Sequence, residues 1–166
     1  RGELRPPFAE PTAAGQESVW DFPRPPLLEP VPKPVRVLNG STELAFSSGA
    51  RRVLETAGAP TYYLPPNDTV ESLLVSLGAA SICEWKGVAR SFALVGASPA
   101  MPVAWSYQET FREFLDIQGW YAFYPTQLDC YVGEERVAPQ PGGYYGGWVT
   151  KNLRGPIKGE AGSGHW

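Results

Sequence analysis

Short runs of alternating apolar and polar residues, separated by residues typical of turns, make up most of the chain after residue 34. The runs 35–38 and 42–46 flank Asn39-Gly40, a dipeptide typical of two-residue β-hairpin turns. The other predicted strands are 52–56, 61–64, 81–94 (one long strand or two strands bent at Gly87), 103–107, 121–124, 129–132 and 135–137, the last two joined by a hairpin turn at Gly133-Glu134. Short strands at this spacing predict an all-β or β-dominated domain.

Two segments have helical rather than alternating spacing. Apolar residues recur at i, i+3, i+4 and i+7 at Val70, Leu73, Leu74 and Leu77. This pattern predicts a helix that Asp68 or Thr69 can cap. Residues 109–117 are expected to form a second short helix or helical turn with an apolar face. The expected fold is therefore a compact β-domain with two short helices.

The prolines are concentrated toward the N-terminal end, with nine of the 18 in residues 1–34. Proline removes a backbone donor and fixes φ, so this stretch should be irregular or polyproline-like. It also carries large apolar residues that a free linker would not need: Val19, Trp20, Phe22, Leu27 and Leu28. We call this proline-rich stretch the arm. We expect a flexible arm at 1–16, a single domain at 17–160 and a flexible tail at 161–166, with the part of the arm from about residue 17 packed along the surface of the domain.

Composition removes several classes of function. The 166 residues include a single histidine, His165, which argues against Ser-His-Asp or Cys-His catalysis and against sites with two histidine ligands. A formal net charge of −3 gives no reason to expect nucleic acid or an anionic membrane as a partner. No apolar run reaches the length of a transmembrane helix, and the start lacks the pattern of a signal peptide, so a cytoplasmic location is expected.

A series of motifs in this order resembles the family known as domain of unknown function 427. They are 17–26 (ESVWDFPRPP), 52–56 (RVLET), Tyr62-Tyr63, 83–87 (CEWKG), 104–107 (AWSY), 122–125 (AFYP) and 139–150 (PQPGGYYGGWVT). The resemblance runs from about residue 17 to residue 166, and it implies a compact β-fold of the Mss4-like, or β-tent, class. The family has no established function.

The resemblance brings two chemical expectations that the residues themselves can be compared with. Its nucleotidyltransferase-like label would require paired carboxylates for Mg²⁺, and the chain has no Asp-x-Asp or Glu-x-Glu pair. Several relatives of the fold hold zinc through Cys-x-x-Cys pairs, which neither Cys83 nor Cys130 can form. We therefore expect no metal and no cofactor.

The segment 83–87 carries the candidate chemistry. In a strand, Glu84 and Lys86 would share one face and Cys83 and Trp85 the other. The charges would need partners, for which Arg52 and Glu55 are candidates. Such a cluster could orient a polar ligand or supply Glu84 or Lys86 for acid–base catalysis, or it could be a structural ion-pair network that fixes strand register. Cys83 could likewise be a nucleophile, although we favour a buried, inert thiol.

Aromatic residues are more numerous than a core of this size needs. The candidates to line a ligand cavity, besides packing in the core, are Tyr62, Tyr63, Trp85, Trp105, Tyr107, Tyr124, Tyr145 and Trp148. The glycines of 142–148 are not followed by a helix, as a phosphate loop would be, so we expect them to allow sharp bends or close backbone approach.

Three hypotheses for function follow. In the first, which we favour, the chain binds a small molecule in an aromatic pocket whose polar groups come from Arg52, Glu55, Glu84 and Lys86. In the second, it is a metal-independent enzyme on a small metabolite, with Glu84 or Lys86 as acid or base. In the third, it is a homodimeric scaffold without a ligand.

Overall fold

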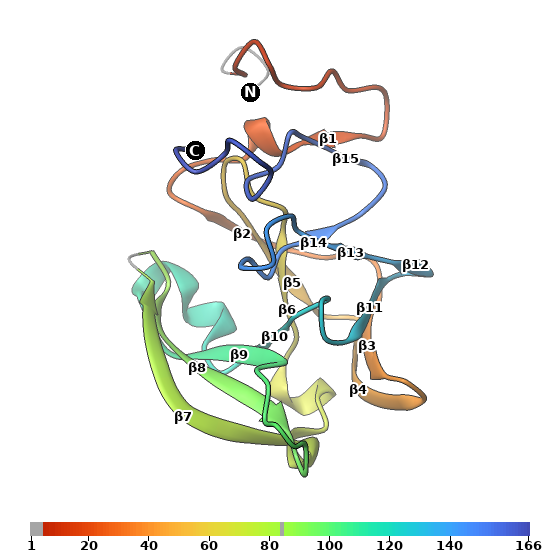
Figure 1. Cartoon of the computed structure of the whole chain (residues 1–166), viewed down its shortest axis with the longest axis vertical. Helices are drawn as coiled ribbons and strands as arrows, with labels where there is room; N and C mark the ends of the chain where they lie inside the picture. The colour runs from red at the N-terminus through yellow and green to blue at the C-terminus, as the bar shows by residue number, and fades with distance from the viewer. Residues whose placement is uncertain (1–4, 84) are drawn as a thin grey trace.

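The computed structural model describes residues 5–83 and 85–166. A curved antiparallel sheet with the strand order β10–β9–β8–β7 lies at the lower left of Figure 1. The strands are β7 (Leu74–Cys83), β8 (Gly87–Leu94), β9 (Ala104–Thr110) and β10 (Tyr121–Phe123). The region predicted as 81–94 thus contains the end of β7, up to Cys83, and β8 from Gly87, which agrees with the second of the two alternatives.

A second antiparallel sheet has the order β12–β11–β3–β4. It contains β3 (Val35–Asn39), β4 (Thr42–Ser47), β11 (Asp129–Val132) and β12 (Glu135–Arg136). Both predicted hairpins are confirmed. Gly40 and Gly133 have φ values of +61° and +60°, which a residue without a Cβ adopts at little cost.

A third sheet, β2–β5–β6, lies between these two and connects them to the arm. Its strands are β2 (Leu27–Pro30), β5 (Arg51–Leu54) and β6 (Thr61–Tyr63). Two small pairs complete the strands: antiparallel β13 (Ala138–Pro139) with β14 (Trp148–Val149), and parallel β1 (Glu17–Ser18) with β15 (Leu153–Arg154). The predicted all-β class is confirmed, whereas the tent-like arrangement stays a prediction.

The helical segments of the described chain are short 3₁₀ turns. They are η2 (Val19–Asp21), η3 (Pro66–Asp68), η4 (Glu71–Leu73) and η5 (Arg112–Ile117). The predicted helix beginning near Asp68 is wrong, because the chain makes only two 3₁₀ turns before Leu74 enters β7 and pairs with Leu94. Long-range pairing with β8 thus overrides a local helical spacing. The expected helical turn within 109–117 is confirmed by η5, although β9 extends to Thr110.

The main hydrophobic core lies between the sheets and includes the fully buried Trp148. The indole Nε1 of Trp148 donates a hydrogen bond of 2.9 Å to the carbonyl oxygen of Phe123, and its ring stacks on Tyr62 at 4.7 Å between centroids. Trp148 therefore belongs to the core and holds β14 against β6 and β10.

The arm packs against the body, as expected from residue 17 onward. Val19 and Phe22 are buried and Trp20 packs beside them, whereas Leu27 is exposed, contrary to expectation. Before residue 17, Phe8 lies against Trp20 and stacks on Trp166, so the two ends of the chain meet at one end of the molecule (Figure 1). The division at 1–16, 17–160 and 161–166 stays a prediction. Within the described ranges, no helix has both the length and the apolar character needed to cross a membrane.

Candidate functional site

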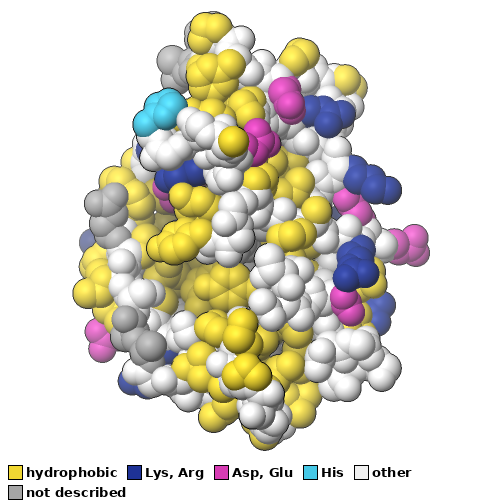
Figure 2. All heavy atoms as spheres, viewed as in Figure 1, with side chains coloured by type: hydrophobic (Ala, Val, Ile, Leu, Met, Phe, Trp, Pro, Cys, Tyr) yellow, Lys and Arg dark blue, Asp and Glu magenta, His cyan; other side chains and the backbone are white. Residues whose placement is uncertain are grey.

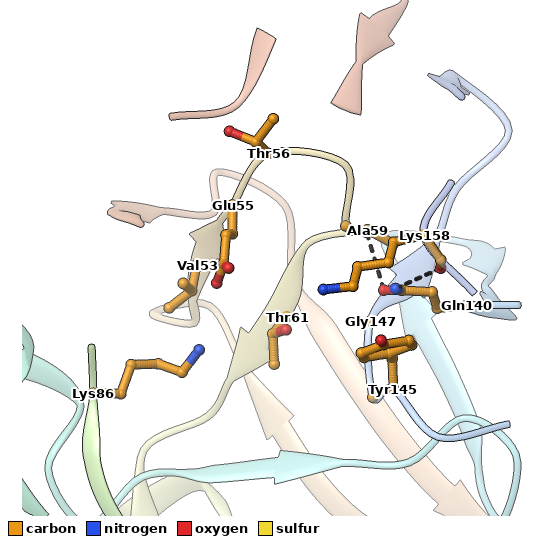
Figure 3. A pocket seen from close by; sticks show the side chains of 12 residues that line it. Val53, Glu55, Thr56, Ala59, Thr61, Lys86, Gln140, Tyr145, Gly147 and Lys158 are labelled. Carbon is orange, nitrogen blue, oxygen red and sulfur yellow. Dashed lines mark hydrogen bonds between the residues drawn. The ribbon is translucent and has the colours of Figure 1, made fainter. Parts of the chain in front are cut away.

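A pocket of about 150 Å³ opens where four segments meet (Figure 3). They are the turn from β5 to β6, the turn from β7 to β8, the chain before β14 and the segment after β15. Hydrophobic side chains gather over the middle of the face that Figure 2 presents. The residues that line the pocket are Val53, Glu55, Thr56, Gly58, Ala59, Thr61, Lys86, Gln140, Tyr145, Gly146, Gly147 and Lys158. Polar and apolar groups thus share its wall.

One buried amide holds two sides of the pocket together. The side chain of Gln140 is almost inaccessible, with 4% exposure. Its Oε1 accepts a hydrogen bond of 3.0 Å from the backbone N–H of Ala59, and its Nε2 donates one of 2.9 Å to the carbonyl of Lys158 (Figure 3). Both ends of the amide are therefore satisfied, and the β5–β6 turn is tied to the segment that carries Lys158.

The β5–β6 turn is held from both sides. Ala57 has a φ of +73°, a conformation that costs an alanine about 1 kcal/mol. Its N–H donates to the carbonyl of Val19 at 3.0 Å, and its carbonyl accepts from the N–H of Lys158 at 2.7 Å. Contacts to the arm and to the C-terminal segment therefore fix the turn that presents Glu55 and Ala59 to the pocket.

Two glycines let the chain before β14 close the pocket wall. A Cβ on Gly146 would lie 2.1 Å from the ring of Trp105. One on Gly147 would lie 2.2 Å from Oε1 of Gln140 and 2.7 Å from the carbonyl of Ala59. This confirms the expectation of close backbone approach in the glycine-rich motif. It also shows that the ring of Trp105 packs behind the pocket wall, against Gly146.

Charged groups enter the pocket from different sides. In Figure 3, Lys86 and Lys158 extend toward its middle from opposite sides, and Glu55 lies on the side of Lys86. The ammonium of Lys86 lies 5.9 Å from the ring centroid of Tyr107, and that of Lys158 lies 5.5 Å from that of Tyr145. Among the described residues, no ion pair involves Glu55, Lys86 or Lys158.

Arg52 and Tyr62, expected in the same cluster, lie elsewhere. They line a separate hollow of about 400 Å³. The guanidinium of Arg52 bonds both carboxylate oxygens of Glu17 at 2.8–2.9 Å and Glu29 at 2.6–2.7 Å. Burial opposes its charge, but these two carboxylates outweigh that effect and raise the pKa of Arg52. Arg52 therefore joins the arm to β5, and the expected grouping of Arg52 with Lys86 is wrong.

The segment 83–87 is not a continuous strand, which corrects the argument from alternating faces. Trp85 and Lys86 lie in the turn between β7 and β8, because β7 ends at Cys83 and β8 begins at Gly87. Trp85 lines a different, mainly apolar hollow with Pro25, Pro26, Phe111, Glu113 and Phe114. Glu84, a predicted partner in the cluster, lies outside the described residues.

Beneath Lys86, a second core cluster contains Tyr63, Tyr107 and, at its margin, Cys83 and Trp105. Tyr63 is fully buried, and no described group lies in normal hydrogen-bonding geometry with its hydroxyl, although the indole of Trp105 comes close enough to oppose the rise of its pKa. Burial raises the pKa of Tyr63 well above its usual value, and burial together with the neighbouring Cys83 does the same to Tyr107. Both phenols are therefore neutral at ordinary pH and serve as the floor under Lys86.

The unpartnered hydroxyl of Tyr63 leads to a stability prediction. Tyr63→Phe should leave the free energy of unfolding unchanged or raise it by up to about 1 kcal/mol, because it removes a buried polar atom that makes no hydrogen bond. Tyr121→Phe should lower it by about 1 kcal/mol, since the hydroxyl of Tyr121 donates to Glu71 at 2.7 Å. Urea unfolding of both variants checks this, and a clear destabilisation by Tyr63→Phe would contradict it.

The cysteines are free thiols, with Cys130 buried and Cys83 partly buried. Burial raises the pKa of the Cys130 thiol, which keeps it protonated and unreactive. Within residues 5–83 and 85–166, no three side chains of His, Cys, Asp or Glu come together in a way that could hold a metal ion.

One protein family, described as a domain of unknown function (DUF427), matches residues 27–134, which is well over half of the chain. The chain belongs to the DUF427 family. A comparison with curated proteins found no match. The part that matches DUF427 contributes Glu55, Thr61 and Lys86 to the pocket, whereas Gln140, Tyr145 and Lys158 follow it. The pocket thus combines the DUF427 region with the chain that comes after it.

Sequence reasoning identified part of this pocket and missed the rest. Glu55, Lys86 and Tyr145 were expected at a site and line the pocket. Lys158 was missed, because it stands in a glycine-rich stretch without a motif around it. Gln140 lies inside a quoted motif, and a polar residue between Pro139 and Pro141 was the one signal that could have identified it.

Proposed function

We propose that the chain binds a small molecule in the pocket of Figure 3, with Lys86, Lys158 and Glu55 contacting its polar groups. The observation that carries this proposal is the pair of ammonium groups that extend into one pocket without a carboxylate partner among the described residues. Both lysines are partly buried, and a ligand with an acceptor group would give them the partner that the described residues do not.

The wall of the pocket supports the proposal because it is already formed. Both polar ends of the Gln140 amide make hydrogen bonds. The backbone at Gly146 and Gly147 packs directly against the groups behind it, with no space for a further methyl group. Ligand sites are usually preformed, with a few polar groups placed among apolar ones. A volume of about 150 Å³ matches a cavity that holds one benzene-sized molecule. The ligand, or the part of it that enters, is therefore about one ring in size.

Filling the pocket tests the proposal. Thr61→Phe places a ring at the pocket wall, whereas Thr126→Phe places the same ring on an exposed turn outside the pocket. In a ligand-observed NMR screen of ring-sized fragments, we expect binders of the natural protein to lose at least about tenfold in affinity in Thr61→Phe and to bind Thr126→Phe unchanged. Equal binding to all three proteins would contradict the proposal, provided circular dichroism shows that both variants are folded.

Three further expectations belong with this proposal. An acid–base role for Lys86 or Glu84 stays a prediction, since the pocket contains Lys86 and Glu84 lies outside the described residues. A homodimer and a cytoplasmic location likewise stay predictions.

A further inference from the structure

We infer that the ligand of this pocket is a small organic anion, whose carboxylate or phosphate group lies between Lys86 and Lys158. The inference rests on the proposed function and adds the chemical class of the ligand to it. Of the charged residues that line the pocket, two are positive and one is negative. A bound monoanion would therefore balance the charge of the described lining.

Arginine forms the ion pairs in the part of the chain that the structure describes. Every ion pair among the described residues joins an arginine to an aspartate or glutamate. The two pocket lysines are outside this network, although Glu55 lines the same pocket. Two ammonium groups facing one small volume repel each other, and an anion between them attracts both, which outweighs that repulsion. The arrangement therefore favours an anionic occupant over a neutral one.

Aromatic rings hold both ammonium groups in place without using up their donors. The separations of 5.9 Å from Lys86 to the Tyr107 ring and 5.5 Å from Lys158 to the Tyr145 ring lie within the range of cation–π attraction. A ring face accepts no conventional hydrogen bond, so the three N–H donors of each ammonium remain available. Carboxylate and phosphate oxygens are the acceptors that form the strongest hydrogen bonds with such donors.

The remaining lining restricts the rest of the ligand. Val53, Ala59 and the ring of Tyr145 offer apolar contact to a ring-sized body. The carboxylate of Glu55 repels a second anionic group and accepts a hydrogen bond from a hydroxyl or amino group. The ligand class is thus a compact organic acid with one anionic group, on which a hydroxyl or amino substituent is favourable.

Matched probes of equal size test the inference. Benzoate and phenyl phosphate carry the two candidate anionic groups, and benzamide is the neutral counterpart of benzoate. By NMR titration at low salt, we expect at least one anion to bind about tenfold or more tightly than benzamide. The stronger of the two anions identifies the carboxylate or the phosphate as the group that the pocket accepts.

Lysine variants locate the effect. Lys86→Met and Lys158→Met should each weaken binding of the preferred anion about fivefold to tenfold and leave benzamide binding unchanged. Lys33→Met, which removes a lysine outside the pocket, should change neither. Should a variant fail to fold, salt provides a second measurement. Raising the ionic strength should weaken binding of the anion and leave binding of benzamide unchanged.

The outcomes separate this inference from the proposed function. If benzamide binds as tightly as the anions, or if Lys33→Met weakens anion binding as much as the pocket variants do, the inference is overturned while the pocket can still be a binding site. If anion binding is insensitive to both pocket lysines and to salt, the inference is also overturned. If neither these probes nor neutral fragments of similar size bind, the proposed function itself fails.

Discussion

Gly147→Ala is expected to lower the free energy of unfolding by about 2–3 kcal/mol, the cost of forcing an extra methyl group into a packed site. The new Cβ would lie 2.2 Å from Oε1 of the buried Gln140 and 2.7 Å from the carbonyl of Ala59. Relief would require Gln140 to move and so to give up its hydrogen bonds to Ala59 and Lys158. The substitution should therefore distort the pocket as well as destabilise the fold. Urea unfolding gives the stability, and fragment titration gives the binding.

A neighbouring glycine supplies the control for this prediction. The nearest contacts of a Cβ on Gly58 would be 3.7 Å to the carbonyl of Glu55 and 3.9 Å to Oε1 of the same Gln140, which are ordinary distances. Gly58→Ala should therefore change stability by less than about 1 kcal/mol, and in the stabilising direction if the unfolded chain loses entropy. Equal effects of the two alanines would show that the close approach at Gly147 does not fix the wall.

Arg52→Gln is expected to lower the free energy of unfolding by about 2–3 kcal/mol. Arg52 makes a bidentate contact with Glu17 of β1 and a further contact with Glu29 of β2. Its side chain is 17% exposed, and those of Glu17 and Glu29 are 33% and 34% exposed. The loss should fall below the 3–5 kcal/mol or so of a fully buried pair, because water partly screens these charges.

The adjacent Arg51 provides the matched comparison for Arg52. It contacts Asp116 at 3.4 Å, and 69% of the Asp116 side chain is exposed. Arg51→Gln should therefore change stability by no more than about 0.5 kcal/mol. Limited proteolysis adds a second measurement, since loss of Arg52 should expose the arm near β1 to cleavage before the body unfolds. A protein that tolerates both substitutions equally would show that the ion pairs of Arg52 do not hold the arm in place.

The β-structure of the body followed from local signals in the sequence. Asn39-Gly40 and Gly133-Glu134 specify hairpins through backbone conformations that can be read one turn at a time. The segment 68–77 failed for the opposite reason, since Leu73 and Leu74 suit a helical face as well as a turn followed by a strand. Pairing between β7 and β8 decides between these states, and that contact is invisible to a local pattern.

The pocket was predictable only in part, because residues far apart in the sequence build it. Lys86 was predicted at a site as a charge among apolar neighbours, with Glu55 as a candidate partner, and the structure brings both to the pocket. Arg52 was the other candidate partner, but its own partners come from the arm, at Glu17 and Glu29. Lys158 reaches the pocket because the side chain of Gln140 donates a hydrogen bond to its carbonyl. Neither segment alone has a sequence pattern that predicts this long-range contact.

The most direct measurement is a ¹H–¹⁵N NMR spectrum of the natural protein titrated with benzoate and phenyl phosphate. The binding account predicts that at least one anion gives saturable shifts, largest for the backbone amides of Gly58, Gly146 and Gly147, which line the pocket. Lys158→Met should reduce these shifts at the same probe concentration. Saturable shifts confined to another surface, such as the hollow beside Trp85 and Phe111, or no shifts with either anion, would contradict the assignment of this pocket as an anion-binding site.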